Sequence, residues 1–306
     1  SGGHDTLTGG GWYDRLFGGS GRDLIIGGSS VVDSGTGLPT YDVLRGQGGN
    51  NDTLIGGDGN DKLNGGAGHD NLVGGGGDDV LSGESGDDTL DGGAGTDRLY
   101  ERANVDMTLT DASLSGGLGS DDLTSIETAY LKGGNSNNRL NASAFSGDVT
   151  MIGVGGADTL RGGAGNDMIN GRSGDDSITG GDGNDTLLGA AGDDLLDGGP
   201  GTDQLRQTIN EHQVLTDSQA TGMGTDALWS IEQGRLTGGI GGNELDASGF
   251  SGNVTLWGLD GDDTLYGGTS DDLLDGGLGT DQVRQSVNSD QILTNSQLTG
   301  MGPTHC

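Results

Sequence analysis

The chain has 306 residues, of which 70 are glycine, 29% are hydrophobic and 4% are aromatic, and its formal net charge is -34. So little apolar material cannot offset the conformational entropy lost on folding, so we expect the chain to be disordered unless a ligand stabilises it. The two lysines and eleven arginines are nowhere clustered in the sequence, which argues against nucleic acid as a partner. No apolar run is long enough for a signal peptide or a membrane span.

A nine-residue repeat runs through most of the chain. One copy reads GGDGNDKLN from Gly56 to Asn64, and the next begins at Gly65. The last three residues of each copy predict a very short strand whose middle aliphatic side chain points inward. The first six predict a turn, where glycine allows positive φ or a close approach to the next turn. Two copies make a coil of eighteen residues, and stacking places equivalent turns about 4.8 Å apart.

An aspartate closes nineteen of these turns and is followed two residues later by an aliphatic side chain. Stacked turns then enclose carboxylate and carbonyl oxygens, which suits a hard cation such as calcium with its 6–8 oxygen ligands at roughly 2.3–2.6 Å. Without the cation the stacked carboxylates repel one another. The predicted calcium ligands are Asp5, Asp14, Asp23, Asp42, Asp52, Asp61, Asp70, Asp79, Asp88, Asp97, Asp158, Asp167, Asp176, Asp185, Asp194, Asp203, Asp263, Asp272 and Asp281.

Calcium-binding runs alternate with metal-poor segments along the chain. The predicted runs are residues 1–100, 153–206 and 258–284, the predicted metal-poor β-coil segments are 101–152 and 207–257, and 285–306 is the truncated start of a third segment. A loop insertion at 29–40 interrupts the first run, and we expect it to project from one edge. If each ion is shared by turns one coil apart, the runs hold about 13 calcium ions. These ions reduce the net charge from -34 to about -8.

The metal-poor segments repeat each other. LTDSQATGMG at 215–224 matches LTNSQLTGMG at 293–302, and SIE occurs at 125–127 and 230–232. Their length predicts about three further coils of roughly 20 residues. Asn138 and Asn243 stand where a turn aspartate is expected, and apolar packing is expected around Phe145, Phe250 and Leu256. The alternative is a separate domain that bulges from the roll.

The tandem copies of G-G-x-G-x-D-x-U-x resemble the RTX, or haemolysin-type, calcium-binding repeats. That resemblance implies an all-β fold, a right-handed parallel β-roll or β-helix solenoid with calcium in its glycine-rich turns. It also implies type I export and folding outside the cell, at the cell surface, where calcium is plentiful. A single cysteine, Cys306, cannot form an internal disulfide, so the metal takes the place of a covalent cross-link.

Rolls of this family accompany proteases, lipases, epimerases and pore-forming toxins, and also occur in surface-layer, sheath and adhesin proteins. The sequence contains no H-E-x-x-H, G-x-S-x-G or P-loop motif, so no enzyme is predicted. The histidines are far apart, at His4, His69, His212 and His305. Adjacent acids such as Asp78 and Asp79 are interpreted as one ligand beside one solvated neighbour. The tryptophans suit either glycan contact or cover for the aliphatic ladder, at Trp12, Trp229 and Trp257.

The predicted function is an extracellular calcium-binding structural protein that self-associates, head-to-tail or laterally, into a surface layer, sheath or fibre. Both ends of the sequence fall inside a repeat, so we expect open coils that stack on neighbours or continue in a larger array. One alternative is a calcium-dependent folding and secretion module of a larger RTX toxin or secreted enzyme. Another is an adhesin arm that binds cell-surface glycans through the inserted loop and the aromatic side chains.

Overall fold

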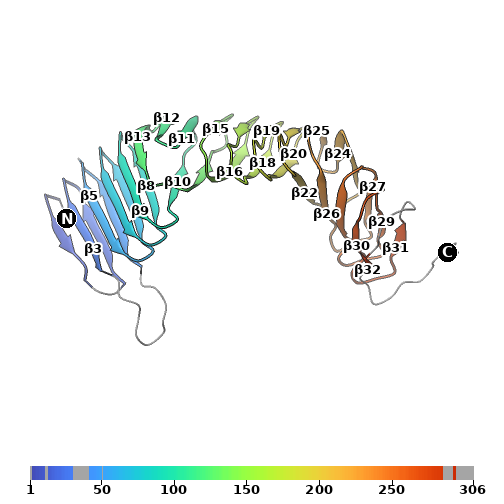
Figure 1. Ribbon diagram of the computed structural model, residues 1–306, viewed down its shortest axis with the longest axis horizontal. Helices are drawn as coiled ribbons and strands as arrows, with labels where there is room; N and C mark the ends of the chain where they lie inside the picture. Colours follow the sequence, from blue (N-terminus) through green and yellow to red (C-terminus); the bar gives the residue numbers. More distant parts are fainter. Residues whose placement is uncertain (1, 11–12, 30–40, 50, 285–291, 294–306) are drawn as a thin grey trace. The chain divides into compact units, whose positions relative to one another are not determined.

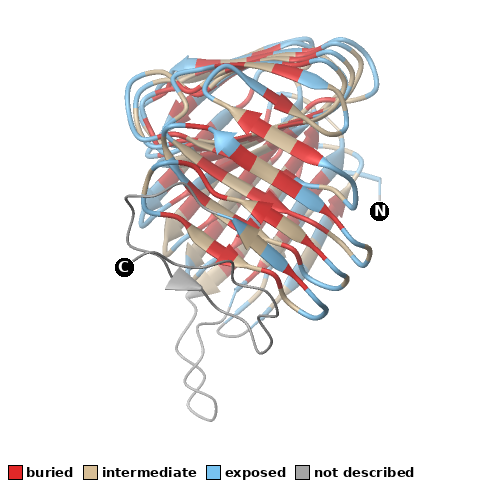
Figure 2. Cartoon of the chain, turned by 90° about the vertical axis from the view of Figure 1, so that its right-hand side faces the viewer, coloured by how far each residue is buried: buried red, intermediate tan, exposed pale blue. Residues whose placement is uncertain are grey.

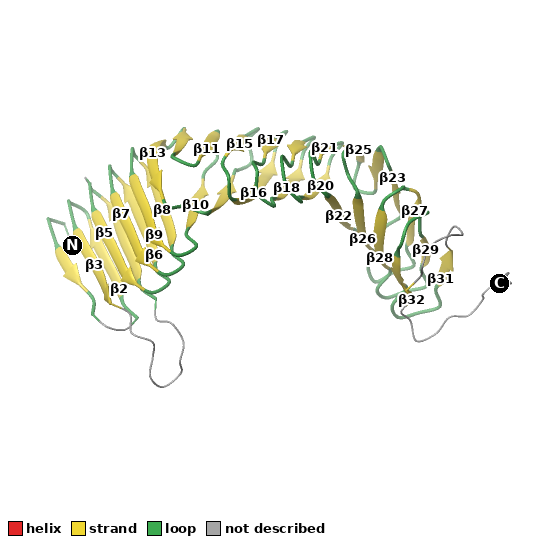
Figure 3. Cartoon of the chain, in the orientation of Figure 1, coloured by secondary structure: helices red, strands yellow, loops and turns green. Residues whose placement is uncertain are grey.

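The computed structural model describes residues 2–10, 13–29, 41–49, 51–284 and 292–293. All regular structure in these residues is β-strand, as predicted, and Figure 3 shows only strands and connecting loops. The residues cluster into two compact units, the first comprising Ser1–Ile152 with Gly162–Gly165 and the second Gly153–Arg161 with Asn166–Cys306. The inserted loop, Trp12, His305, Cys306 and most of the third metal-poor segment lie outside the described residues.

In unit 1 the chain alternates between two sheets of stacked strands (Figure 1). In spatial order, sheet 1A contains β1 (Thr6–Thr8), β3 (Leu24–Ser29), β5 (Thr53–Asp58), β7 (Asn71–Gly76), β9 (Thr89–Ala94), β13 (Gly119–Thr124), β12 (Ser113–Gly116), β11 (Met107–Thr110) and β15 (Arg139–Ala144). Sheet 1B contains β2 (Arg15–Gly19), β4 (Val43–Gly48), β6 (Lys62–Ala67), β8 (Val80–Ser85), β10 (Arg98–Arg102), β14 (Thr128–Lys132) and β16 (Asp148–Gly155), of which β16 belongs to unit 1 up to Ile152.

Unit 2 repeats this plan. Sheet 2A contains β17 (Thr159–Arg161), β19 (Ser177–Thr179), β21 (Leu195–Asp197), β25 (Thr225–Trp229), β24 (Gln219–Thr221), β23 (Gln213–Thr216), β27 (Glu244–Gly249), β29 (Thr264–Tyr266) and β31 (Gln282–Arg284). Sheet 2B contains β18 (Met168–Ser173), β20 (Thr186–Ala191), β22 (Gln204–Thr208), β26 (Gln233–Thr237), β28 (Asn253–Trp257), β30 (Leu273–Asp275) and β32 (Ile292–Leu293).

From β3 to β10 the core is a ladder of single aliphatic side chains, one from each strand, whereas strands such as β14 and β16 bury two apolar side chains each. In sheet 1A the parallel register places Leu54 beside Leu72 and Leu72 beside Leu90, which is the predicted period of eighteen residues. All three side chains are fully buried, while their neighbours along the strand face outward. Figure 2 shows the resulting alternation of buried and exposed bands along the strands. Because each strand from β3 to β10 gives one buried aliphatic side chain, the core of this stretch is thin and offers limited hydrophobic stabilisation.

The metal-poor segment of unit 1 continues both sheets, but it is not built only of simple parallel coils as we expected. In unit 1, β12 runs antiparallel between β11 and β13, so the chain folds back twice before the parallel ladder resumes. In unit 2, β24 lies antiparallel between β23 and β25 in the same manner. Threonines close the tight turns, because Thr110 Oγ1 accepts the Ser113 N–H at 3.0 Å and Thr216 Oγ1 accepts the Gln219 N–H at 3.0 Å.

Parallel stacking also corrects our reading of the basic residues as scattered. Six of them come from strands of sheet 1B: Arg15, Arg45, Lys62, Arg98, Arg102 and Lys132. Apart from Arg98 and Arg102, successive members of this set are 17 to 36 residues apart, yet the sheet places them on adjacent or alternate strands. The sequence alone does not show this clustering, because the coil period must be combined with the side to which each strand residue points.

Candidate metal sites in the glycine-rich turns

The turn aspartates form continuous ladders along each unit. In unit 1, Asp79 Oδ1 accepts the backbone N–H of Asp61 at 2.7 Å, and Asp97 Oδ1 accepts that of Asp79 at 2.8 Å. Fifteen of the nineteen predicted ligands accept such a bond from the coil before them: Asp23, Asp42, Asp52, Asp61, Asp70, Asp79, Asp88, Asp97, Asp176, Asp185, Asp194, Asp203, Asp263, Asp272 and Asp281. The other four donate their N–H to the ladder: Asp5, Asp14, Asp158 and Asp167.

The second carboxylate oxygen of these residues has a different environment. It is buried and has no hydrogen-bond donor in Asp23, Asp42, Asp52, Asp61, Asp70, Asp79, Asp88, Asp97, Asp176, Asp194, Asp203 and Asp263. A buried carboxylate oxygen without a partner carries a large desolvation cost. The same geometry repeated in turn after turn indicates that a partner of positive charge belongs beside each of these oxygens.

Glycine leaves the space for that partner. A Cβ added to Gly56 would lie 2.5 Å from Asp61 Oδ2 and 2.5 Å from the carbonyl oxygen of Gly74, one coil ahead. We call this space, bounded by the first glycine of a turn, the aspartate Oδ2 and the carbonyl one coil ahead, the cradle. The same arrangement recurs at Gly74, whose cradle is formed by Asp79 Oδ2 and the carbonyl of Gly92. Two oxygens that converge on a space too small for a side chain fit a hard cation such as calcium.

The electrostatics of the turns agree with this interpretation. Burial, followed by repulsion from facing aspartates, raises the pKa of Asp61 to about 6 and the pKa of Asp79 to about 7. In unit 2 the same causes raise the pKa of Asp176 to about 7. The metal-free turns therefore disfavour the charged carboxylates. Among the described residues no three acidic, histidine or cysteine side chains cluster as one metal site, so carbonyl oxygens must supply much of any coordination shell.

In unit 1 the ladders end on two acidic residues that the sequence analysis did not assign. Asp88 donates its N–H to Asp121 Oδ1 at 3.1 Å, and Asp97 donates its N–H to Glu127 Oε2 at 2.8 Å. Asp121 is buried, and burial raises its pKa to about 6. These two residues thus take the place of the next turn aspartates, although neither is followed by a normal nonapeptide.

In unit 2 the ladders of the run at residues 153–206 end in the same way. Asp194 donates its N–H to Asp226 Oδ1 at 3.2 Å, and Asp203 donates its N–H to Glu232 Oε2 at 2.8 Å. Burial raises the pKa of Asp226 to about 7. The sequence does contain a signal for these positions, since G-S-D at 119–121 and G-T-D at 224–226 each precede an S-I-E triplet. We matched the triplets but overlooked the aspartates.

The residue before each ladder aspartate has a role that the sequence analysis missed. Asp78, interpreted as a solvated neighbour of Asp79, accepts the N–H of Thr96 through Oδ1 at 2.9 Å and donates its own N–H to Asn60 Oδ1 at 3.0 Å. His69 Nδ1 is likewise within 3.0 Å of the N–H of Asp87. These exposed side chains form a second ladder that links the backbones of successive coils.

The remaining polar and aromatic candidates do not converge on a catalytic arrangement in the described part of the chain. His212 lies 3.4 Å from Glu244, and both side chains are about half exposed. Trp229 is exposed, and the Arg235 guanidinium lies 4.0 Å from the ring centre of Trp257. The described residues contain no helix capable of crossing a membrane.

The fold and the turns define a class: a parallel β-solenoid whose glycine-rich turns present aspartate and carbonyl oxygens. The model of the RTX calcium-binding nonapeptide repeat matches residues 1–30, 36–72, 47–81, 64–99, 152–187, 171–205 and 248–283. These matches cover more than half of the sequence, so the chain belongs to the RTX calcium-binding repeat family. RTX repeats bind calcium and are typically found in secreted proteins.

No curated protein matches the chain. Among solved structures, the chain is similar to the extracellular lipase LipA from Serratia marcescens, with 21% sequence identity and a TM-score of 0.28. The alignment covers 69% of this chain and 43% of the lipase. The chain therefore spans less than half of the length of that enzyme.

Proposed function

We propose that this protein is an extracellular calcium-binding structural protein whose roll folds when calcium binds and then assembles into a surface layer, sheath or fibre. The nineteen turn aspartates supply carboxylate ligands, and about 13 ions occupy the cradles. Asp121 and Asp226 extend the ladders at the ends of two runs. We propose no catalytic role for the chain, and we place it at the cell surface after type I export.

The observation that carries the calcium-dependent step is the divided role of each turn carboxylate. Oδ1 is satisfied by a backbone N–H one coil back, whereas Oδ2 is buried without a donor and faces the carbonyl of the next coil, as in Asp61, whose Oδ1 accepts the Asp42 N–H. From β3 to β10 the aliphatic ladder gives one buried side chain for each strand. In so thin a structure the free energy of cation binding contributes directly to the free energy of folding.

The support for assembly is the regularity of the nonapeptide runs. Between Asp52 and Asp97, coils of eighteen residues in parallel register give a stiff element whose turns are held by ions, and this suits a load-bearing role outside the cell. Calcium binding also lowers the net charge from -34 to about -8, which reduces the repulsion between copies. A roll that folds but stays monomeric would instead suit a folding and secretion module of a larger protein.

Calcium titration of the chelated protein, followed together by circular dichroism and light scattering, tests both steps. We expect a transition from coil to β-structure, followed by scattering that rises as ordered particles form. A parallel titration with magnesium is the control, because magnesium prefers octahedral geometry at 2.0–2.1 Å and retains its water. Folding without calcium, or equal folding with magnesium, contradicts the calcium step. Folding at constant monomer mass contradicts assembly and supports the alternative, a folding and secretion module of a larger protein.

A further inference from the structure

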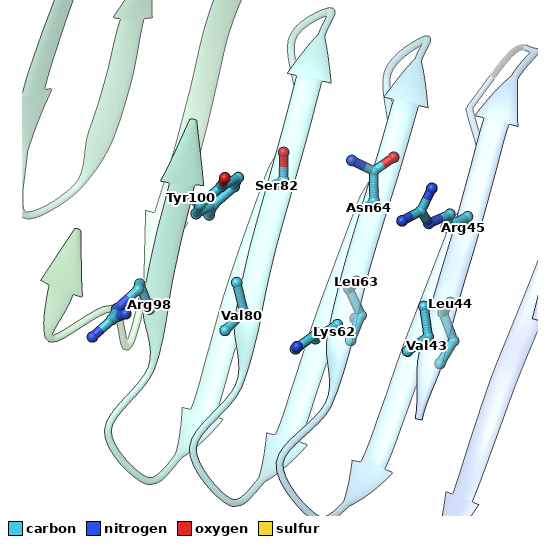
Figure 4. Close-up of a pocket in the computed structure, with 10 residues that line it drawn as sticks. All are labelled: Val43, Leu44, Arg45, Lys62, Leu63, Asn64, Val80, Ser82, Arg98 and Tyr100. Atoms are coloured by element: carbon cyan, nitrogen blue, oxygen red, sulfur yellow. The ribbon is translucent and has the colours of Figure 1, made fainter. Parts of the chain in front are cut away.

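The outer face of sheet 1B carries a groove that no calcium role explains (Figure 4). Three contiguous hollows of about 380, 410 and 480 Å³ extend across β2, β4, β6, β8 and β10, and Arg45 lines all three. Lys62 lines the first two, and Tyr100 lines the last two. We call these hollows together the basic groove.

Glu84 and Glu101 also line the largest of the three hollows, beside Arg102, but neither lies within 4.0 Å of a lysine or arginine nitrogen. Among the described residues the ion pair within 4.0 Å is His212 with Glu244, and no lysine or arginine takes part in one. Arg15 and Lys62 instead lie 5.2 and 5.7 Å from the ring centres of Tyr13 and Tyr41. In a chain with 47 acidic residues and 13 lysines and arginines, cations left without a carboxylate are available to an external anion.

The opposite sheet provides an internal comparison. The strands β1, β3, β5, β7, β9 and β13 of sheet 1A contain neither lysine nor arginine. Both sheets obey the same nonapeptide pattern, so the pattern itself does not require cations on one side. The positive charge of unit 1 is therefore concentrated on one face of the roll.

The spacing of the charges indicates what kind of anion fits. The register aligns Arg15, Lys62 and Arg98 in one row, with Val43 and Val80 between them. Cations on alternate strands are roughly 9–10 Å apart. Double-stranded DNA carries one charge per roughly 1.7 Å of its axis, so this row matches a far more sparsely charged polymer.

A second row lies two residues further along the same strands. It aligns Phe17 with Arg45, Arg45 with Asn64, and Asn64 with Ser82, and Figure 4 shows Asn64, Ser82 and Tyr100 following one another across the sheet. Beyond them the Tyr100 and Tyr130 rings stack with centroids 4.9 Å apart. Asn64 Nδ2 donates to Glu84 Oε1 at 2.7 Å and Ser82 Oγ donates to Glu101 Oε1 at 3.1 Å. The neutral groups left to a sugar chain beside the cations are therefore the aromatic rings, such as those of Tyr100 and Tyr130.

We propose that the basic groove binds an extended acidic polysaccharide, with Arg15, Lys62 and Arg98 contacting successive acidic groups and Arg45 at its centre. A polymer with one acidic group for each sugar or each disaccharide fits the low charge density of the row. The site requires the folded roll, and hence calcium, but it does not require the roll to assemble. It also differs from glycan contact through the tryptophans or the inserted loop.

The test compares two triple variants of equal charge at saturating calcium. R45Q/K62Q/R98Q removes cations of the groove, and R139Q/R161Q/R206Q removes the same charge from β15, β17 and β22. The probe is an oligogalacturonate hexamer, which is short enough to limit gelling by calcium, and maltohexaose is the neutral control. Calorimetry and ¹H–¹⁵N chemical-shift mapping report binding, and circular dichroism confirms that each variant folds.

We expect the hexamer to bind the parent with shifts confined to β2, β4, β6, β8 and β10. The groove variant should bind about tenfold or more weakly, because three charge-assisted contacts are lost, whereas the second triple variant should bind like the parent. Equal weakening in both variants would show long-range charge alone and overturn the proposal. So would absence of hexamer binding, or a duplex DNA that displaces the hexamer at lower concentration. If the parent does not bind the hexamer but dimerises, and only the groove variant fails to dimerise, the basic groove binds a second copy of the chain and the proposal is overturned.

Discussion

Two stretches of unit 1 stabilise the same parallel ladder in different ways. Between Asp52 and Asp97 the first glycine of every turn faces an aspartate Oδ2, and each strand buries one leucine. In the following segment Asn138 replaces the aspartate, and Phe145 and Met151 join the buried core. We expect the first stretch to depend on ions in its turns and the second to depend on apolar contact. Loss of a turn carboxylate is thus accompanied by a larger hydrophobic core.

The largest effect should follow from Asp79→Ala. This change removes the acceptor of the Asp61 N–H and the oxygen of the Gly74 cradle, so it should disturb the ions on both sides. We expect the calcium concentration at the folding midpoint to rise about tenfold or more. Hydrogen exchange should speed up in β7 to β9 and stay slow in β14 to β16. Unchanged metal content and melting temperature would mean that the cradle does not hold the ion.

Asp78→Ala is the matched control for that change. It removes the same kind of side chain from the adjacent position, but Asp78 is exposed and bonds only to backbone N–H groups of the neighbouring coil. We expect its cost to stay near 1 kcal/mol, with the calcium stoichiometry unchanged.

A change that fills the cradle but keeps the carboxylate should destabilise the protein less than Asp79→Ala does. In Gly56→Ala the new Cβ would lie 2.5 Å from both Asp61 Oδ2 and the Gly74 carbonyl, so it would displace the ion or the turn. We expect a loss of about 1–3 kcal/mol in calcium. Gly76→Ala is the control, because its Cβ would meet only Asp58 Oδ1 at 3.7 Å and the stacked residue is already Ala94. Equal melting temperatures for the two variants would exclude a bound ion at this point.

Much of this arrangement follows from the nonapeptide alone. The period of eighteen, the inward leucines and the ladder aspartates such as Asp61 and Asp79 all depend on residues within one repeat, and repetition makes them easy to recognise. The antiparallel strand β12 was not predicted, because its formation depends on pairing with β11 and β13 rather than on a local period. Asp121 was missed for the same reason, since its partner Asp88 is 33 residues away and no regular repeat connects them.

Between pH 4 and pH 7, a rise in pH should favour folding when calcium is present and should oppose folding when calcium is removed. Burial and the facing Asp61 and Asp97 raise the pKa of Asp79 from 3.8 to about 7. Without calcium the folded state therefore binds more protons than the unfolded chain, so any β-structure that forms in chelator should be greatest near pH 4 and should be lost by pH 7. With calcium the ion competes with these protons, so affinity should increase over the same window. Calorimetry in buffers of different ionisation enthalpy should detect proton release on binding at pH 6 and little at pH 8.5.

The smallest effect, and the most direct link between the two kinds of turn, concerns Asn243 in unit 2. Its Oδ1 accepts the Gly239 N–H at 2.7 Å and faces the space at Gly238, where the Gly258 carbonyl oxygen lies 2.7 Å from an added Cβ. This turn is a cradle with a neutral ligand. Asn243→Asp keeps the shape of the side chain and supplies the missing charge, so we expect one additional calcium ion per chain and a slightly higher melting temperature in calcium.

At subsaturating calcium the same Asn243→Asp variant should be less stable than the parent, because a further carboxylate is then buried without an ion beside Asp263, whose Oδ1 already accepts the Asn243 N–H. Asn210→Asp adds the same charge at an exposed position nearby and serves as the control. A metal count that rises equally in both variants, or in neither, would show that charge at this turn does not decide whether a coil binds calcium. A rise confined to Asn243→Asp would show that a single oxygen separates the metal-binding coils from the metal-poor ones.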